Sequence, residues 1–275
     1  MNIILRLKGL IAAVLTHRLV GYSIGKITGE RIPAFGLTID TSNSAVSARI
    51  KAKLFFGIYE SSERRFVRKY LGGNGAVVEL GSSLGVLTCL IRKSLLQGQT
   101  LVAVEANPTL VTIIERNLAL NECAGNTFIE AAAISYTQAP YAMFQRAQHS
   151  TDGRVISDHC TARDGVRVPT TRLANVLEKY NLRDFVLVSD IEGAEWSMFK
   201  NDLPALRRAT LIIIELHNSD RGEPYGVLLN QILGAGFELM DQYGSTCVFR
   251  PSRVIESPIS HLAKEDQKPP LPIQD

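Results

Sequence analysis

A chain of 275 residues is long enough for one large domain or two small ones, and its composition of 45% hydrophobic and 21% charged residues is typical of a soluble globular protein. The formal net charge of +3 does not indicate a dedicated nucleic-acid surface, which would need a dense basic stripe, so no nucleic-acid partner is expected. The four cysteines have neither the short spacing of a zinc site nor the pattern of a disulfide framework, and this favours a reducing, cytoplasmic compartment.

The N-terminal segment, residues 1–25, is apolar but is interrupted by charged residues such as Arg6 and Lys8. No apolar run reaches the roughly 18 residues of a membrane-spanning helix, and no cleavage site of the secretory type follows an apolar core. We expect a helix here, and its favoured interpretation is that its apolar face packs on the domain. The alternative is a helix lying on a membrane surface, with its basic residues toward anionic lipid.

Further along the chain, short apolar runs alternate with helical patterns, which predicts a parallel sheet covered on both faces. The runs are rich in β-branched residues, as is typical of buried parallel strands. The expected strands are Ala76–Glu79, Thr100–Glu105, Asn126–Ala132, Phe185–Asp190 and Leu211–Leu216. The expected helices are Leu84–Leu96, Pro108–Leu120, Thr171–Tyr180 and Tyr225–Ala235.

Two further regions bear on the site. Residues 136–168 are polar and are expected to be irregular, as a long insertion near the carboxyl edge of the sheet that could shape a substrate site. Near the end of the domain, the strand-like runs Phe237–Gln242 and Thr246–Arg250 are separated by three residues, which predicts an antiparallel hairpin. Such a hairpin distinguishes the sheet from that of a dinucleotide dehydrogenase, whose strands are all parallel.

The strongest local signal is the run Val77–Gly85, in which an apolar strand leads through a glycine turn into a helix. Gly81 would allow the sharp turn, and Gly85 would allow the helix to pack closely on the strand or a ligand to approach. The glycine spacing is G-x-x-x-G and not the G-x-G-x-x-G of nicotinamide-binding proteins. The helix start can accept an anionic group, and the carboxylate of a methionine moiety suits it better than a pyrophosphate.

The second signal is an acid, Glu105, at the carboxyl end of the next strand, about 20 residues after the glycine turn. Its two oxygens can accept hydrogen bonds from the two hydroxyls of a ribose. The alternative is that Glu105 caps the helix that starts near Pro108, but Asn107 can do so instead. The turn and the acid together predict a site for an adenosyl cofactor.

These motifs resemble those of the FkbM family of S-adenosylmethionine-dependent methyltransferases. The resemblance covers roughly residues 55–250, and it includes the run Phe56–Glu63, the glycine turn, the strand end Val104–Pro108, the run Ala131–Ser135, and most specifically Asp190–Glu195 followed by Ile214–His217. Four positions depart from the family pattern: Glu79 stands where Asp is frequent, Ser82-Ser83 where Ala-Asn is frequent, and Val188 where a Lys is frequent.

The resemblance implies an α/β fold with a Rossmann-like class I methyltransferase sheet, mostly parallel and ending in a C-terminal antiparallel hairpin. It also implies S-adenosylmethionine as cofactor and methyl transfer, commonly to a hydroxyl of a sugar, a polyketide or another secondary metabolite. We expect residues 1–54 to form an N-terminal helical extension, residues 55–252 the methyltransferase domain and residues 253–275 a disordered tail. The expected cofactor-binding residues are Tyr59, Glu60, Glu79, Gly81, Ser83, Gly85, Glu105, Ala106 and Asn107.

Methyl transfer to an alcohol needs a group that takes the hydroxyl proton. Asp190 and Glu192 stand at the carboxyl end of the fourth strand, and Glu215 and His217 at that of the fifth, where both should face the cofactor crevice. His217 is a candidate base because the ordinary pKa of histidine lies near neutral pH. Asp190 is the other candidate, or it positions the acceptor hydroxyl, and Glu192 is the third residue of the expected catalytic set.

Each of these residues also has a structural interpretation. His217 could merely hold a loop, and Glu192 and Glu195 could stabilise the N-terminus of a short helix. Asp190 with Glu215 could bind magnesium, although a site without metal is favoured.

Two other functions stay open, an NAD-dependent oxidoreductase and a non-catalytic adenosyl-binding module. The glycine spacing speaks against the oxidoreductase, and the intact motif residues speak against the module. A small-molecule or glycan acceptor is expected, and the sequence predicts neither its identity nor the oligomeric state.

Overall fold

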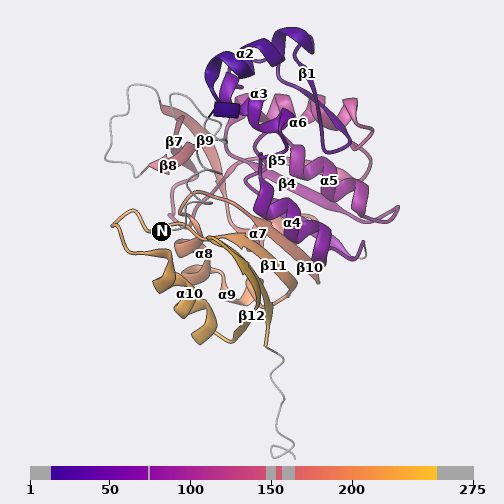
Figure 1. Ribbon diagram of the computed structural model, residues 1–275. Coiled ribbons are helices and arrows are strands. Elements are labelled where there is room, and N and C mark those ends of the chain that lie inside the picture. Colours follow the sequence, from indigo (N-terminus) through magenta and orange to yellow (C-terminus); the bar gives the residue numbers. More distant parts are fainter. Residues whose placement is uncertain (1–13, 74, 147–152, 157–164, 253–275) are drawn as a thin grey trace, which may run out of the picture.

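The computed structural model describes residues 14–73, 75–146, 153–156 and 165–252, and a seven-stranded sheet forms its centre (Figure 1). In spatial order its strands are β12 (Phe237–Tyr243), β13 (Thr246–Pro251), β11 (Ala209–Glu215), β10 (Phe185–Ser189), β3 (Ala76–Leu80), β4 (Leu101–Glu105) and β5 (Thr127–Ala131). Strand β13 is antiparallel to both of its neighbours, and the other neighbouring strands are parallel. The predicted fold class, a mostly parallel sheet with a C-terminal antiparallel hairpin, is therefore confirmed.

The sheet is buried on both faces because its strands carry apolar side chains in unbroken runs. In β10, for example, all five residues are buried. One face packs against α4 (Ser61–Tyr70) and α5 (Val86–Ser94), and α6 (Pro108–Leu120) lies beside α5. The opposite face packs against α7 (Leu173–Lys179), α8 (Glu195–Asn201), α9 (Leu203–Leu206) and α10 (Tyr225–Gly234).

The strand order reverses direction between β3 and β10. The chain winds outward from β3 through β4 to β5 on one side, and from β10 to β11 on the other. A crevice for a ligand is expected outside the carboxyl ends of the strands at such a reversal. The fold thereby brings the glycine turn after β3 next to the end of β10.

The N-terminal part of the described chain adds α2 (Arg18–Ile27), a two-stranded hairpin of β1 (Arg31–Ala34) and β2 (Leu37–Asp40), and α3 (Ala48–Phe55). Asn117 of α6 and Asn121, the C-cap residue of that helix, hold the outer edge of β2. Asn117 Oδ1 accepts a hydrogen bond of 2.7 Å from the backbone N–H of Asp40, and Asn121 bonds to both backbone groups of Thr38. These bonds satisfy backbone groups that a short edge strand would otherwise leave without partners.

The expectation that residues 136–168 are irregular is wrong for the described part of that region. Strands β7 (Tyr141–Arg146), β8 (Gly153–Ile156) and β9 (Gly165–Thr171) join β6 (Ala133–Ile134) in a second, four-stranded sheet. Pairing of β9 with β6, which directly follows β5, places this sheet at the carboxyl edge of the central one (Figure 1). The insertion thus lies where the sequence placed it, but long-range strand pairing orders it.

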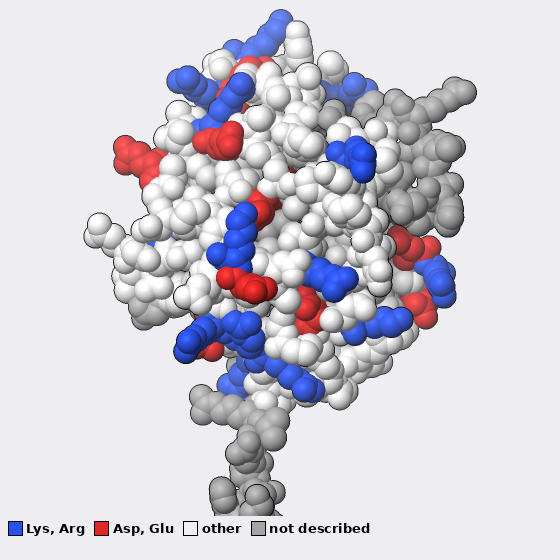
Figure 2. Space-filling model, turned by 180° about the vertical axis from the view of Figure 1, so that it is seen from behind, with Lys and Arg blue, Asp and Glu red and all other residues white. Residues whose placement is uncertain are grey.

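The N-terminal helix expected within residues 1–25 lies partly outside the described residues, and the tail expected at residues 253–275 lies wholly outside them. Within the described part of the chain, no helix has the length and apolar character needed to cross a membrane. On the face of the molecule seen in Figure 2, acidic and basic side chains are interspersed over most of the surface.

Candidate active site

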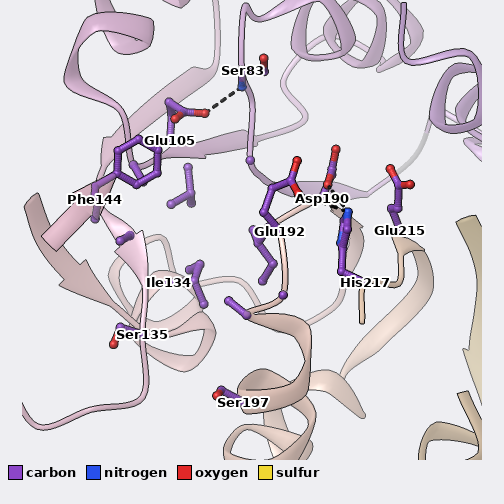
Figure 3. Close-up of a pocket in the computed structure, with 18 of the residues that line it drawn as sticks. Ser83, Glu105, Ile134, Ser135, Phe144, Asp190, Glu192, Ser197, Glu215 and His217 are labelled. Atoms are coloured by element: carbon purple, nitrogen blue, oxygen red, sulfur yellow. Dashed lines mark hydrogen bonds and ion pairs between the residues drawn. The ribbon is translucent and has the colours of Figure 1, made fainter. Parts of the chain in front are cut away.

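A cavity of about 670 Å³ opens at the carboxyl ends of β3, β4, β10 and β11. Its lining includes residues of the glycine turn, of both strand ends named in the sequence, and of the second sheet. Figure 3 shows Glu105 and Phe144 on one side of the cavity and a group of carboxylates around His217 on the other. The two sides have different chemistry, and each is built from different strands.

The glycine turn is fixed by a close approach of two strand ends. Gly81 has a φ of +84°, and a Cβ built on it would lie 1.8 Å from the carbonyl oxygen of Asp190. The N–H of Gly81 donates to the carbonyl of Val104 (2.9 Å), while the N–H of Asp190 donates to the carbonyl of Leu80 (2.9 Å). Only glycine fits here, because any side chain would displace the end of β10.

Glu105 is 5% exposed and lines the cavity. Its Oε2 accepts from the backbone N–H of Ser83 (2.8 Å), and its Oε1 accepts from that of Asn107 (2.7 Å). Burial raises the pKa of this carboxyl to about 7, against the opposing effect of its backbone donors. The two backbone bonds fix the carboxylate in place, and each oxygen keeps a further lone pair that can accept from a ligand hydroxyl.

Six of the nine expected cofactor-binding residues line this one cavity. Tyr59 joins the glycine turn directly, since its hydroxyl lies 2.8 Å from Ser83 Oγ. Glu60 stands at the start of α4 with a left-handed φ of +45°, and burial, followed by repulsion from Glu79 and Glu63, raises its pKa well above the ordinary value. The six residues are Tyr59, Glu60, Gly81, Ser83, Glu105 and Ala106.

The other three expected residues, Glu79, Gly85 and Asn107, are not among the cavity-lining residues. Ser82 Oγ donates to the buried carboxylate of Glu79 (3.2 Å), so Glu79 stabilises the glycine turn through this hydrogen bond. The Asn107 side chain caps α6 by accepting from the N–H of Thr109, as expected.

Gly85 was expected to allow the helix to pack closely on the strand or a ligand to approach, and the structure shows a different role. Its φ of +75° ends the glycine turn, and a Cβ built on it would lie 3.1 Å from a side-chain carbon of Ile114 in α6. The partner of its close approach is therefore a neighbouring helix. Because Gly85 is the N-cap of α5, the helix predicted from Leu84 begins at Val86.

His217 lies at the centre of the carboxylate group. Its Nε2 is 3.7 Å from Asp190 Oδ1 and 3.5 Å from Glu192 Oε2, while its Nδ1 is 3.1 Å from Glu195 Oε1. The Glu195 side chain is fully buried and also accepts from the backbone N–H groups of Ile191 and Gly193. All three expected catalytic residues, Asp190, Glu192 and His217, therefore meet at one point of the cavity, and Glu195 fixes both the turn and the imidazole ring.

The pKa of His217 in the structure is not the ordinary pKa of histidine that was expected from the sequence. Burial lowers the pKa of the ring, but the hydrogen bond to Glu195 and the charges of Glu195, Asp190 and Glu192 raise it to about 9. Burial and the charges of Glu215 and Glu192 raise the pKa of Asp190 well above its usual range. His217 is therefore protonated at neutral pH and is a poor base, so the carboxylates beside it are the candidate proton acceptors.

Sequence reasoning missed Glu63, which interacts with Glu215. Glu63, in the first turn of α4, is 6% exposed and accepts from the hydroxyl of Thr246 (3.0 Å). Burial and the charge of Glu215 raise the pKa of Glu63, while a backbone hydrogen bond opposes this shift. Glu215 accepts from the hydroxyl of Ser245 (2.8 Å). The only sequence signal was an acid in a first helical turn, which is common without any site.

The second sheet supplies apolar lining that the sequence also missed. Phe144 of β7 is 4% exposed, packs with Ala133 and Val168, and lines the cavity on the side of Glu105 (Figure 3). Tyr136 ties this region to the main domain, because its hydroxyl donates to Asp202 (2.8 Å). The pairing that places Phe144 here joins residues far apart in the chain and leaves no local pattern.

A comparison with protein-family models finds one described as the Methyltransferase FkbM domain, which matches residues 65–250. The chain belongs to the FkbM methyltransferase family. This membership confirms the resemblance expected from the motifs, and it sets aside the alternative of an NAD-dependent oxidoreductase.

Solved structures similar to this FkbM family member include a protein in the NADB-Rossmann superfamily from Streptococcus agalactiae, with 12% identity, coverage of 70% of this chain and 68% of that one, and a TM-score of 0.44. Another is the ribosomal protein L11 methylase from Lactobacillus delbrueckii subsp. bulgaricus (10%, 70% and 77%, 0.41). A third is a Streptococcus pneumoniae protein in complex with S-adenosyl-L-methionine (11%, 71% and 74%, 0.43). No curated protein sequence matches the chain, so the family assignment rests on the family model.

The buried carboxyl of Glu79 makes stability depend on pH. Burial raises its pKa from 4.5 to about 8, so its contribution to folding is complete below about pH 4.5 and is lost as the pH rises through 8. Glu79→Gln removes this loss. Between pH 5 and pH 9 the variant should lose less free energy of unfolding than the wild type, by at least about 1 kcal/mol. Urea unfolding at both pH values measures the difference.

Glu238→Gln, an exposed change of the same type on β12, should follow the wild type. Equal losses in the wild type and in Glu79→Gln would contradict the assigned pKa.

Proposed function

We propose that the chain is an S-adenosylmethionine-dependent O-methyltransferase. The observation that carries this proposal is the arrangement of the glycine turn and Glu105 at two adjacent strand ends within one cavity. In that arrangement Glu105 binds the two ribose hydroxyls, and the start of α5 favours the methionine carboxylate. Family membership supports the methyl-transfer chemistry.

The rest of the cavity suits the remaining parts of this cofactor. Phe144, on the side of Glu105, offers an apolar ring face to the adenine. The sulfonium and the ammonium group of the cofactor are both cationic, and the carboxylate of Glu60 lines the cavity near the glycine turn. Asp190, Glu192 and His217 would act on the acceptor that receives the methyl group.

Transfer is an in-line displacement at the methyl carbon. The bond between sulfur and the methyl carbon breaks while the acceptor oxygen forms a new bond to that carbon, which leaves S-adenosylhomocysteine and a methyl ether. The acceptor proton passes to the carboxylate of Asp190, which lines the cavity beside His217. We assign the acceptor to the hydroxyl-bearing small molecules and glycans, and we expect no nucleic-acid partner. Peripheral membrane contact through residues 1–25 and a cytoplasmic location stay predictions.

Glu105→Gln tests the cofactor site. The amide cannot replace a charged acceptor for the ribose hydroxyls, so the affinity for S-adenosylmethionine should fall at least about tenfold. Isothermal calorimetry on the purified protein measures it. Glu178→Gln, the same change at an exposed position of α7, should bind like the wild type. If Glu105→Gln folds and its affinity is unchanged, the proposed cofactor site is wrong.

Asp190→Asn tests the chemistry. It should slow methyl transfer by roughly 10²-fold or more while the affinity for S-adenosylmethionine stays within a few-fold of the wild type, because the amide cannot take the proton. The assay follows radiolabelled methyl from the cofactor to a panel of monosaccharides and their nucleotide-linked forms. Label that survives mild alkali excludes a methyl ester. Transfer at the wild-type rate would remove Asp190 from this role, and label lost in alkali would contradict O-methylation of a hydroxyl.

A further inference from the structure

The cluster of Asp190, Glu192 and His217 has a donor set that fits a metal ion. Each residue offers one ligand atom, and the three atoms all lie within 4.8 Å of one another. The Nε2 atom of His217 is 3.5 Å from Glu192 and 3.7 Å from Asp190, so it is too far from both for a normal hydrogen bond. Such spacings suit atoms that share a cation, since adjacent ligands around a small divalent ion stand about 3 Å apart.

A second observation is independent of the spacing. The Oδ1 atom of Asp190 is buried and has no hydrogen-bond partner among the described residues. A buried carboxylate oxygen without a donor is costly, because it loses its hydration without replacement. This oxygen lies on the cavity side that faces the imidazole (Figure 3).

The imidazole is oriented as a ligand would be. Glu195, fully buried, holds Nδ1 of His217 at 3.1 Å and so directs Nε2 toward the two carboxylates. A carboxylate that accepts from the second ring nitrogen is the usual outer partner of a metal-bound histidine. Two backbone N–H groups fix Glu195 itself, so the ring has little freedom to turn.

We propose that Asp190, Glu192 and His217 bind a divalent cation, Mn²⁺ or Mg²⁺, and that the acceptor hydroxyl occupies an open coordination position. Two carboxylates and one imidazole favour these ions over softer metals. Three protein ligands leave positions for the acceptor oxygen and water. The part of this inference that concerns the acceptor rests on the proposed function. The cation replaces the Nε2 proton of His217, which passes to solvent, and Oδ2 of Asp190 remains available for the acceptor proton while Oδ1 coordinates.

This site differs from the expectation drawn from the sequence, which favoured no metal and considered only Asp190 with Glu215. Glu215 is instead held by Ser245 and faces Glu63. Glu192 and His217 take its place, because the turn after β10 and the end of β11 bring them together.

The test uses the full chain, without S-adenosylmethionine, and Mn²⁺ as the probe. Electron paramagnetic resonance follows free Mn²⁺ during titration, and one ion per chain should be taken up. Glu192→Gln and His217→Gln should each weaken uptake at least tenfold. Glu195→Gln, a positioning change, should weaken it about 10- to 100-fold. Glu238→Gln, with the same charge change outside the cavity, should leave uptake as in the wild type.

Calorimetry with S-adenosylmethionine shows whether each variant has folded, since these residues are not expected to hold the cofactor. Absence of Mn²⁺ uptake by wild-type protein that binds S-adenosylmethionine would overturn the metal site and leave the proposed function standing. Uptake unchanged in a folded His217→Gln protein would also overturn it. Mn²⁺ uptake without any binding of S-adenosylmethionine would instead contradict the proposed function.

Discussion

The contact between Gly81 and the carbonyl of Asp190 is the constraint on which the rest of the site depends. It allows the turn after β3 to press against the end of β10, at the point where the strand order reverses. On one side of the contact the turn presents Ser83 to Glu105, and on the other side Asp190 leads into the turn that carries Glu192. A side chain at Gly81 would separate the cofactor half of the cavity from the carboxylate half.

The site combines a rigid half and a charged half, and the two meet different needs. Backbone donors fix Glu105 before any ligand arrives, so little freedom is lost when a ribose binds. The other half holds several carboxylates around His217. Their mutual repulsion is unfavourable because burial reduces the screening of their charges by water. A cationic cofactor or a divalent ion would relieve that repulsion, which links the electrostatics of the cavity to the ligands proposed for it.

The sequence predicted the central sheet, the terminal hairpin and the cofactor turn because each depends on a local pattern. A β-branched run indicates a buried strand, and a glycine turn followed by an acid on the next strand indicates a ligand-binding crevice. The features that it missed depend on long-range pairing. Phe144 reaches the cavity through the pairing of β7 with β9, and the pKa of His217 is set by Glu195, 22 residues earlier in the chain. Neither arrangement leaves a periodic trace in the sequence.

We propose that Gly81 and Glu105 together hold an adenosyl amino acid at the reversal of the strand order. A crystal structure of the protein with S-adenosylhomocysteine tests it most directly. We expect the ribose hydroxyls on the carboxylate of Glu105, the amino-acid end over the turn at Gly81 and the sulfur facing Asp190. A ligand bound elsewhere in the cavity, with no contact to Glu105, would contradict it.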